Sequence, residues 1–290
     1  MKQSIIAVAA LITLGSCAPM ETSNQSLKTE SMEVKTGISS KEKAVQLIKS
    51  IETGAHEPVG YINAANYTQH NLGVADGLAG FGAVLQQLPP NSAKANTVRA
   101  FQDGDFVFMQ TDYNFFGPKI GFDIFRFEDG LIVEHWDNLQ ETPEAANPSG
   151  HTMLDGTTTV KDLDKTEANK ALVANFIDDV LVNGRMEKLQ GYFDGDNYIQ
   201  HNPQIGDGLS GLGSALEYMA SKGIVMKFDK VHRVLGEGNF VLTVSEGSFG
   251  GQPTSFYDLF RVENGKIAEH WDVMETIAPE ADRKHSNGKF

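Results

Sequence analysis

Hydrophobic residues recur at helical spacing in two parts of the chain. Between residues 44 and 51, and again between 172 and 181, apolar side chains are three or four positions apart, which is the period of one face of an α-helix. Gly54 and Gly184 follow these stretches, where a helix end commonly adopts a left-handed conformation. We therefore predict a helix at the start of each part.

The residues in front of both helices carry capping signals. Ser39 stands three residues before Glu42, and Asp164 stands three residues before Glu167. This is the spacing of a capping box, in which each side chain accepts a hydrogen bond from the other residue's backbone N–H. We expect both helices to begin with this arrangement.

Strand-like segments follow each helix. The first part closes with β-prone runs at 123–127 and 131–137, separated by Asp-Gly at 129–130, and the second part has Asn-Gly at 264–265 in the same place. These dipeptides favour the two-residue turn of a β-hairpin. Helices followed by antiparallel strands indicate an α+β fold, with a curved antiparallel sheet wrapped around N-terminal helices.

Two polar motifs appear in both parts. Tyr-x-Gln-His-Asn occurs at 67–71 and 198–202, and Glu-His-Trp-Asp at 134–137 and 269–272. The separations, 131 residues (198 − 67) and 135 residues (269 − 134), are too long for a solenoid repeat and fit a duplicated small domain. We expect domains at 38–145 and 163–278, a linker at 146–162 and a tail at 279–290.

The composition agrees with a globular protein, and the net charge excludes some classes of binding partner. The 290 residues are 40% hydrophobic and 21% charged, an ordinary globular balance. The formal net charge of −14 makes phosphate backbones and anionic membrane surfaces poor partners. We therefore predict no nucleic-acid binding.

The N-terminus is typical of an exported protein. Lys2 precedes an apolar run and small residues that end at Cys17. Leu-Gly-Ser-Cys resembles the bacterial lipobox, which implies a signal segment at 1–17, lipid on Cys17, and a flexible tether at 18–37. The protein would then be anchored in the bacterial cell envelope, at the periplasmic face of the outer membrane, and would touch the membrane through that lipid only. An ordinary secretory signal with an incidental Cys is the alternative.

The order of these features resembles a known family. A helix, Tyr-x-Gln-His-Asn, Asp-Gly-Leu, a second helix and strands ending in Glu-His-Trp-Asp are similar to the SnoaL-like branch of the nuclear transport factor 2-like superfamily. The resemblance covers both parts and implies two tandem cone-shaped domains, each with a pocket. Relatives include polyketide cyclases, ketosteroid isomerase, limonene epoxide hydrolase, scytalone dehydratase and many non-catalytic binding proteins. Members often dimerise, so we expect an internal pseudo-dimer.

Strand alternation assigns the motif residues to faces. Counting back from a regular two-residue turn puts Arg126, His135 and Asp137 on one face, and Asp123 and Trp136 on the other. The second part divides in the same way, with Arg261, His270 and Asp272 together. By resemblance to limonene epoxide hydrolase, Asp137 and Asp272 match the position of that enzyme's catalytic Asp.

Acid/base chemistry is the first interpretation of these faces. An imidazole beside a carboxylate can move a proton in either direction near neutral pH. The predicted catalytic residues are His135, Asp137, His270 and Asp272. The predicted substrate-binding residues are Gln69, His70, Asn71, Arg126, Gln200, His201, Asn202 and Arg261. The alternatives are a surface His-Asp pair beside a core Trp, and loop side chains that satisfy backbone groups.

The leading hypothesis is cofactor-free aldol-type cyclisation or isomerisation of a small, mostly apolar carbonyl compound. We predict no cofactor because there is no glycine-rich phosphate loop, and no metal because His70, His135 and Asp137 lack a tight ligand spacing. A binding module that holds an apolar ligand without turnover is one alternative. A structural pseudo-dimer with filled cavities is another.

Overall fold

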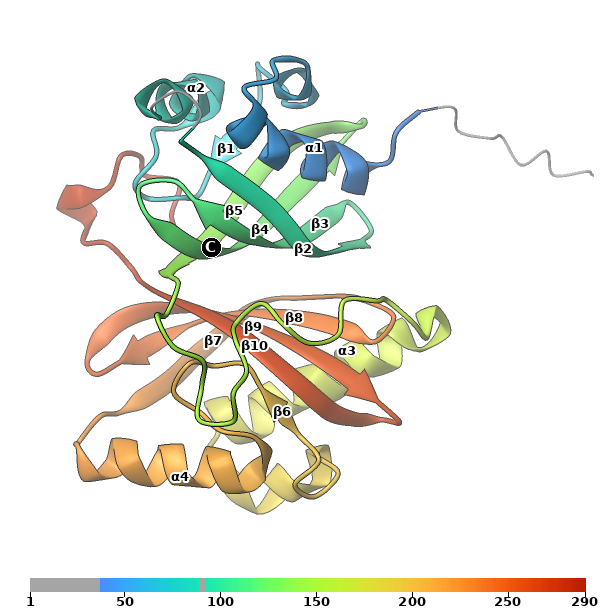
Figure 1. The fold of residues 1–290 in the computed structure, drawn as a ribbon, viewed down its shortest axis with the longest axis vertical. Coiled ribbons are helices and arrows are strands. Elements are labelled where there is room, and N and C mark those ends of the chain that lie inside the picture. Colours follow the sequence, from blue (N-terminus) through green and yellow to red (C-terminus); the bar gives the residue numbers. More distant parts are fainter. Residues whose placement is uncertain (1–36, 89–91) are drawn as a thin grey trace, which may run out of the picture. The chain divides into compact units, whose positions relative to one another are not determined.

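The computed structural model describes residues 37–88 and 92–290 (Figure 1). The predicted signal segment, its Cys17 and the tether as far as residue 36 lie outside the described residues. Residues 38–290 cluster into one unit. Among the described residues, no helix is both long enough and apolar enough to cross a membrane.

The described residues of the first half of this unit, within 38–145, form two α-helices and five strands. In chain order the elements are α1 (Ser40–Thr53), a 3-10 helix (Glu57–Tyr61), β1 (Thr68–Gln69), α2 (Gly77–Gln87), β2 (Lys94–Asp103), β3 (Phe106–Asn114), β4 (Pro118–Glu128) and β5 (Leu131–Glu141).

The second half, residues 163–278, has the same order of strands and α-helices. Its elements are a 3-10 turn (Leu163–Lys165), α3 (Thr166–Phe176) continued by a π-helix (Ile177–Val182), a 3-10 helix (Met186–Tyr192), β6 (Ile199–Gln200), α4 (Gly208–Ser221), β7 (Met226–Glu237), β8 (Phe240–Phe249), β9 (Gln252–Glu263) and β10 (Lys266–Thr276). A 3-10 turn (Glu280–Asp282) lies in the tail.

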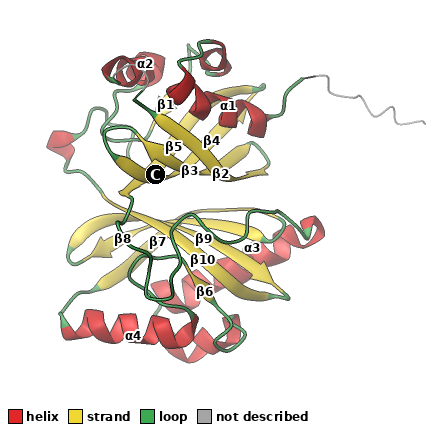
Figure 2. Cartoon of the chain, in the orientation of Figure 1, coloured by secondary structure: helices red, strands yellow, loops and turns green. Residues whose placement is uncertain are grey.

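The two sheets have matching topologies, and the expected α+β class is confirmed (Figure 2). The strand orders are β1-β5-β4-β3-β2 and β6-β10-β9-β8-β7. Neighbouring long strands are antiparallel, as predicted, but the two-residue strands β1 and β6 pair in parallel with β5 and β10. This parallel pairing places the Gln-His-Asn motif directly beside the Glu-His-Trp-Asp motif in each half.

Local sequence signals explain one helix start better than the other. Ser39 and Glu42 form the predicted capping box, and Gly54 ends α1 in the left-handed conformation at φ 67°. Asp164 forms no such cap, because the chain enters α3 through a 3-10 turn and Lys165 takes the cap position without a side-chain hydrogen bond. The predicted capping box at Asp164 is therefore wrong.

Both hairpins turn as predicted, but a β-bulge follows each turn. Asp129 and Gly130 have φ values of 50° and 77°, as a type I′ turn requires. The register then shifts: Phe127 is opposite Ile132, whereas Arg126 is opposite Glu134, so one extra residue lies between them. The same shift occurs in β10. An extra residue exchanges the faces of every side chain beyond it.

The bulge corrects the predicted faces. His135 is opposite Phe125, and Asp137 is opposite Asp123. Asp123 therefore shares the face of His135, and Arg126 lies on the other face with Glu134. In the second half the same correction places Asp258 with His270 and Asp272, and Arg261 with Glu269.

Buried hydrophobic side chains form three clusters. One joins α1 to one face of the first sheet, and a second joins α3 to the corresponding face of the second sheet. The third contains residues of both sheets, including Trp136 and Trp271. In each half, one face of the sheet therefore packs on its own helix, and the opposite face contacts the other half.

The linker follows the first half and contacts the second, and the tail follows the second half and contacts the first. In the linker, Asn147 Nδ2 donates to the carbonyl oxygen of Gln200 at 2.6 Å. In the tail, Asn287 Nδ2 donates to the carbonyl oxygen of Gln69 at 3.0 Å. The two segments thus cover corresponding strands of opposite halves.

Candidate functional site

In the second half, the two motifs meet on the helix-facing side of the sheet. Gln200 is in register with His270 across the parallel pair β6–β10. His270 Nδ1 lies 2.9 Å from Gln200 Oε1, and His270 Nε2 lies 3.1 Å from Asp258 Oδ1. Asn202 Nδ2 donates to both oxygens of Asp272, at 3.0 and 2.8 Å.

Backbone hydrogen bonds fix the direction of this network. Gln200 Oε1 accepts the backbone N–H groups of His201 and Asn202, at 3.0 and 2.9 Å. Because the Oε1 atom is already an acceptor, His270 Nδ1 must carry the hydrogen that points to it. His270 Nε2 is then left to share one proton with Asp258, either as an imidazolium–carboxylate pair or as imidazole and carboxylic acid.

Burial raises the pKa of the second carboxyl group of the site, Asp272. Asp272 is 6% exposed, and burial raises its pKa to about 6 even though the charge of His270 opposes the shift. A carboxyl group with such a pKa can take up and return a proton close to neutral pH. Asp272 is therefore the candidate general base of the second half.

A cavity of about 640 Å³ opens beside these groups. Its polar end is formed by Gln200, Asn202, Asp258, His270 and Asp272. Most of the remaining lining is apolar, from α3, α4 and the strands, and includes Phe176, Phe193, Leu212, Met219, Phe228, Phe249, Phe256, Phe260 and Met274. This volume lies within the usual range of small-molecule sites, about 300–1,000 Å³.

The first half repeats the network. His135 Nδ1 lies 3.1 Å from Gln69 Oε1, and His135 Nε2 lies 3.2 Å from Asp123 Oδ1. Asn71 Nδ2 donates to Asp137 Oδ2 at 2.7 Å. All five side chains correspond to those of the second half, so the polar motif alone does not separate the two halves.

A buried tyrosine contacts the network of the first half. Tyr113 is 2% exposed, and its hydroxyl donates to Asp123 Oδ2 at 2.8 Å. Gly121 makes room for the Tyr113 ring, since a Cβ atom at position 121 would collide with it. The corresponding residues of β8 and β9 are Gly247 and Phe256.

Four of the predicted substrate-binding residues lie on the opposite face of their sheets. Glu134 accepts hydrogen bonds from His70 and Arg126, with Nε2···Oε1 2.9 Å and Nε···Oε2 2.7 Å. His70 also stacks on Trp136, with ring centroids 4.7 Å apart. The second half repeats this group with His201, Arg261, Glu269 and Trp271. Neither His201 nor Arg261 lines the cavity.

The sequence prediction puts Asp258, the counterpart of Asp123, on the face opposite His270, and it does not identify Tyr113. The structure reverses the face of Asp258 because of the bulge in β10. Tyr113 had a detectable signal: aligning the two halves shows that Tyr113 and Gly121 in one are Gly247 and Phe256 in the other.

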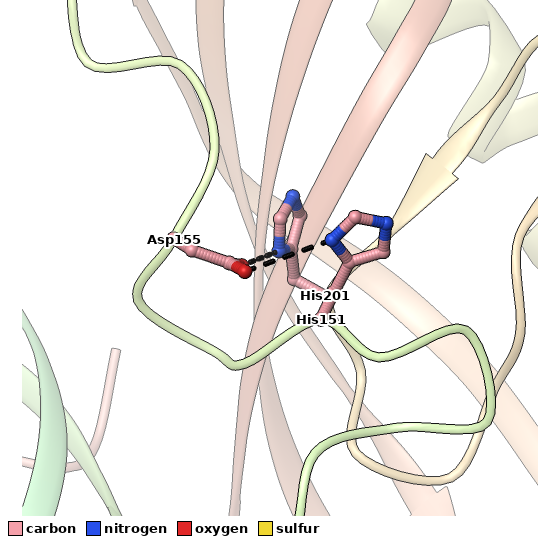
Figure 3. Close-up of side chains that lie close together, drawn as sticks. All are labelled: His151, Asp155 and His201. Atoms are coloured by element: carbon pink, nitrogen blue, oxygen red, sulfur yellow. Dashed lines mark ion pairs between the residues drawn. The ribbon is translucent and has the colours of Figure 1, made fainter.

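Two groups of described residues have donor types suited to a metal ion: Asp123, His135 and Asp137 in the first half, and His151, Asp155 and His201 beside the second (Figure 3). His201 Nδ1 faces the Thr152 carbonyl oxygen at 2.9 Å and Asp155 Oδ1 at 2.7 Å. A nitrogen that donates to a carbonyl has no lone pair for a metal. Both ring nitrogens of His135 likewise face acceptors, so both groups fit hydrogen bonding better than coordination.

One protein family matches part of the second half of the chain. Residues 173–270 match the SnoaL-like domain. The matched segment includes Gln200, Asn202, Asp258 and His270, and Asp272 follows it by two positions. The second half of the chain therefore contains a SnoaL-like domain. No curated protein matches the chain.

Solved structures similar to the chain cover about a third of it. An NTF2-like protein of unknown function from Cytophaga hutchinsonii is 17% identical, with 37% of this chain and 94% of that chain covered and a TM-score of 0.33. IdmH from Streptomyces antibioticus, provisionally assigned as a polyketide cyclase, is 18% identical (36% and 93% covered; TM-score 0.32). A protein of unknown function with a cystatin-like fold from Xanthomonas campestris is 22% identical (37% and 89% covered; TM-score 0.31).

Proposed function

We propose that the second half binds a small, mostly apolar carbonyl compound and moves a proton on it without a cofactor, as a SnoaL-like cyclase or isomerase would. The observation that carries this proposal is the placing of Asp272 and the His270–Asp258 pair together at the polar end of an apolar cavity. A base and an acid within one desolvated site are what enolisation of a carbonyl compound requires.

The proton transfers follow from the geometry. Asp272 removes a proton from the carbon beside the carbonyl group, and the C–H electrons form a carbon–carbon double bond. The carbonyl oxygen takes the proton that His270 and Asp258 share, which gives an enol. If a second C=C is conjugated with the enol, Asp272 returns its proton to the far carbon, the hydroxyl proton goes back to the His270–Asp258 pair, and an isomerisation is complete. In an aldol-type cyclisation the enol carbon attacks a second carbonyl group, the oxygen of that group takes the proton from Asp272, and the enol hydroxyl proton goes back to the His270–Asp258 pair.

The first half has a different proposed role. The Tyr113 hydroxyl binds Asp123 of the first-half network, and we propose that this residue closes the first half to a ligand, so that the first half supports the second rather than catalysing a reaction. The shared hydrophobic cluster around Trp136 and Trp271 supports an internal pseudo-dimer of two tandem SnoaL-like domains. The lipobox-like sequence before Cys17 supports export and lipid anchoring in the cell envelope.

Exchange of carbon-bound hydrogen tests the catalytic proposal. The full chain is mixed with 2-tetralone in D2O, and NMR follows the loss of the protons beside the carbonyl group. We expect the wild type to accelerate exchange and Asp272→Asn to lower the rate at least 100-fold, since positioned acid/base groups contribute about 10²–10⁴. The matched Asp137→Asn variant is expected to keep the wild-type rate.

Binding of 2-tetralone, measured by calorimetry, separates the alternatives. Binding without accelerated exchange would identify a non-catalytic binding module. Absence of both would refute the proposal. Equal losses in Asp272→Asn and Asp137→Asn would show that the first half is also catalytic.

A further inference from the structure

We infer that the first half binds a peptide segment of a partner protein, with one acidic residue, at a site formed by Arg233, Arg126 and Glu134. None of these three residues lines the cavity, so the inference goes beyond the proposed function and does not depend on it. It comes from a comparison of two corresponding sites, which we name after their Glu residues. The Glu269 site contains His201, Arg261, Glu269 and Trp271 with Arg99, and the Glu134 site contains His70, Arg126, Glu134 and Trp136 with Arg233.

The linker fills the Glu269 site with peptide backbone. Arg99 Nη1 donates to the Leu154 carbonyl oxygen at 3.0 Å, and Arg99 Nε donates to the Thr157 carbonyl oxygen at 2.7 Å. Arg99 Nη2 donates to the carbonyl oxygen of Asp155. The Thr157 N–H in turn donates to Glu269 Oε1 at 3.2 Å. A single peptide segment therefore supplies acceptors to the Arg and a donor to the Glu.

An acidic side chain accompanies this backbone. Asp155 Oδ1 lies 2.7 Å from His201 Nδ1 (Figure 3). Burial lowers the pKa of Arg99 to about 10, and the charges of Glu269 and Asp155 oppose this shift, which means that both acids favour the charged guanidinium group. The formal net charge of −14 disfavours a partner with a run of acidic residues, so we expect one acidic residue in the segment.

The Glu134 site has the same side chains but is partly open to solvent. The side chain of Glu134 is 21% exposed and that of Glu269 is 1% exposed. The side chain of Arg126 is 32% exposed and that of Arg261 is 11% exposed. No described residue donates a backbone N–H to the Glu134 carboxylate, as Thr157 does to Glu269. A ligand can therefore reach the surface that corresponds to the one beneath the linker.

Arg233 is the unpaired group of this site. Its guanidinium group lies on the Trp136 ring, with Cζ 3.9 Å from the ring centroid, but it makes no hydrogen bond or ion pair with any described residue. Its neighbour on the next strand is Val244, whereas Arg99 has Gln110 there and donates to it at 2.6 Å. Burial lowers the pKa of Arg233, as expected of a cation that lacks acceptors.

Two of the three guanidinium nitrogens of Arg233 are within reach of a ligand. The residue is half-buried. Its Nη1 is buried without a partner, whereas Nε and Nη2 also lack a partner but are not among the buried unpaired atoms of the described residues, so both keep accessible surface. An edge of two N–H donors matches a carboxylate or two carbonyl oxygens. A peptide segment with an acidic residue supplies both kinds of acceptor.

A synthetic peptide with the sequence of residues 152–158, Thr-Met-Leu-Asp-Gly-Thr-Thr, tests the inference on the full chain. It reproduces the part of the linker that fills the Glu269 site, and it carries a fluorescent label so that anisotropy measures its binding. We expect saturable binding to the wild type. Arg233→Gln should weaken this binding about tenfold, because charge-assisted hydrogen bonds are lost, and Asp155→Asn within the peptide should do the same.

Arg185→Gln is the matched control. It removes the same charge from an Arg whose side chain is 46% exposed and pairs with Asp179, outside both sites. We expect this variant to bind the peptide with wild-type affinity. A loss equal to that of Arg233→Gln would show that net charge governs the binding, and the inference would be wrong.

Urea denaturation separates a binding role of Arg233 from a structural one. Arg99→Gln removes the hydrogen bonds to the linker carbonyl oxygens and should lower the urea midpoint. Arg233→Gln removes no such bond and should change the midpoint much less. Equal losses in the two variants, or failure of Arg233→Gln to fold, would show that Arg233 has an internal structural role and would overturn the inference.

Two further results would overturn the inference. One is that the labelled peptide and a scrambled peptide of the same composition bind equally well or not at all. The other is that peptide binding survives unchanged in Arg233→Gln, because the peptide would then bind elsewhere on the chain. Neither result bears on the cavity, and failure of 2-tetralone to bind or exchange would leave the peptide site standing.

Discussion

The two halves share a polar network and differ in what fills the space above it. In both, a Gln oxygen orients a His, an Asp shares a proton with that His, and an Asn holds a second Asp. The buried Tyr113 binds this network in the first half, whereas the second half has a cavity of about 640 Å³ beside it. The polar motif therefore maintains the same hydrogen-bonded network in both halves. We infer that the ability of a half to bind a ligand depends on the residues outside this motif that line the space beside it.

Opening the first half is the strongest test of this comparison. Tyr113→Ala removes a buried aromatic side chain, and we expect it to lower the free energy of unfolding by about 3–5 kcal/mol. It should also create a second binding site, so calorimetry with 2-tetralone should show two sites per chain in place of one. Tyr113→Phe, which keeps the ring, should retain a single site. A stoichiometry of one in Tyr113→Ala would mean that Tyr113 is not what closes the first half.

The opposite faces of the sheets offer a second comparison. The side chain of Glu269 is 1% exposed and that of Glu134 is 21% exposed. Burial alone would raise the pKa of Glu269, but hydrogen bonds from His201 and Arg261 lower it to about 2. A carboxyl group with a lowered pKa stabilises the fold above its unfolded pKa of about 4.5, and this stability is lost as the pH falls toward 2.

We therefore expect Glu269→Gln to destabilise the protein by about 3 kcal/mol at pH 7, because the substitution removes the buried carboxylate whose pKa the fold lowers to about 2. Glu134→Gln should cost about 1 kcal/mol, as is usual for a more exposed ion pair. Urea denaturation of both variants checks the difference. Equal costs would show that the two outer networks contribute alike, despite their different burial.

The raised pKa of Asp272 predicts a pH dependence of the opposite sign. Because this pKa is about 6 in the folded protein and 3.8 is its ordinary value, the folded state binds the proton more tightly. The stability that this gives is present below pH 4 and is lost as the pH rises through 6, a change of about 2–3 kcal/mol. Exchange of 2-tetralone protons should increase over the same interval, as Asp272 becomes a base.

Denaturation curves between pH 4 and 7 measure this contribution. In Asp272→Asn the corresponding part of the slope should disappear, whereas Asp137→Asn should retain it. An unchanged slope in Asp272→Asn would assign the titration to another group.

Short-range signals made most of the fold predictable. The capping box at Ser39 and the turn at Asp129-Gly130 depend on residues close in sequence, and both occur as expected. The β-bulge in β5, where Val133 is the extra residue, could not be predicted in the same way. A bulge depends on how the strand fits its neighbours in the sheet. One extra residue moved Arg126 away from the predicted site and brought Asp123 into it.

Whether a half contains an open cavity was harder to predict from the sequence. It depends on side chains that meet across strands, so neither Tyr113 nor Gly121 is informative alone. Only the paired exchange with Gly247 and Phe256 shows that the aromatic ring has moved from one strand to the next. This exchange is visible only when the sequences of the two halves are aligned, and neither polar motif indicates it.

A further prediction concerns one hydroxyl group. Tyr113→Phe leaves Asp123 Oδ2 without the hydrogen bond that it now accepts, and the first half then resembles the second, where Asp258 Oδ2 has no partner. We expect a loss of about 1–2 kcal/mol in urea denaturation, the usual cost of an unpaired buried acceptor. A loss near zero would mean that the fold tolerates such an oxygen freely. A loss in the expected range would show that the Tyr113 hydroxyl stabilises the first half through Asp123, a contribution that the second half lacks at Asp258.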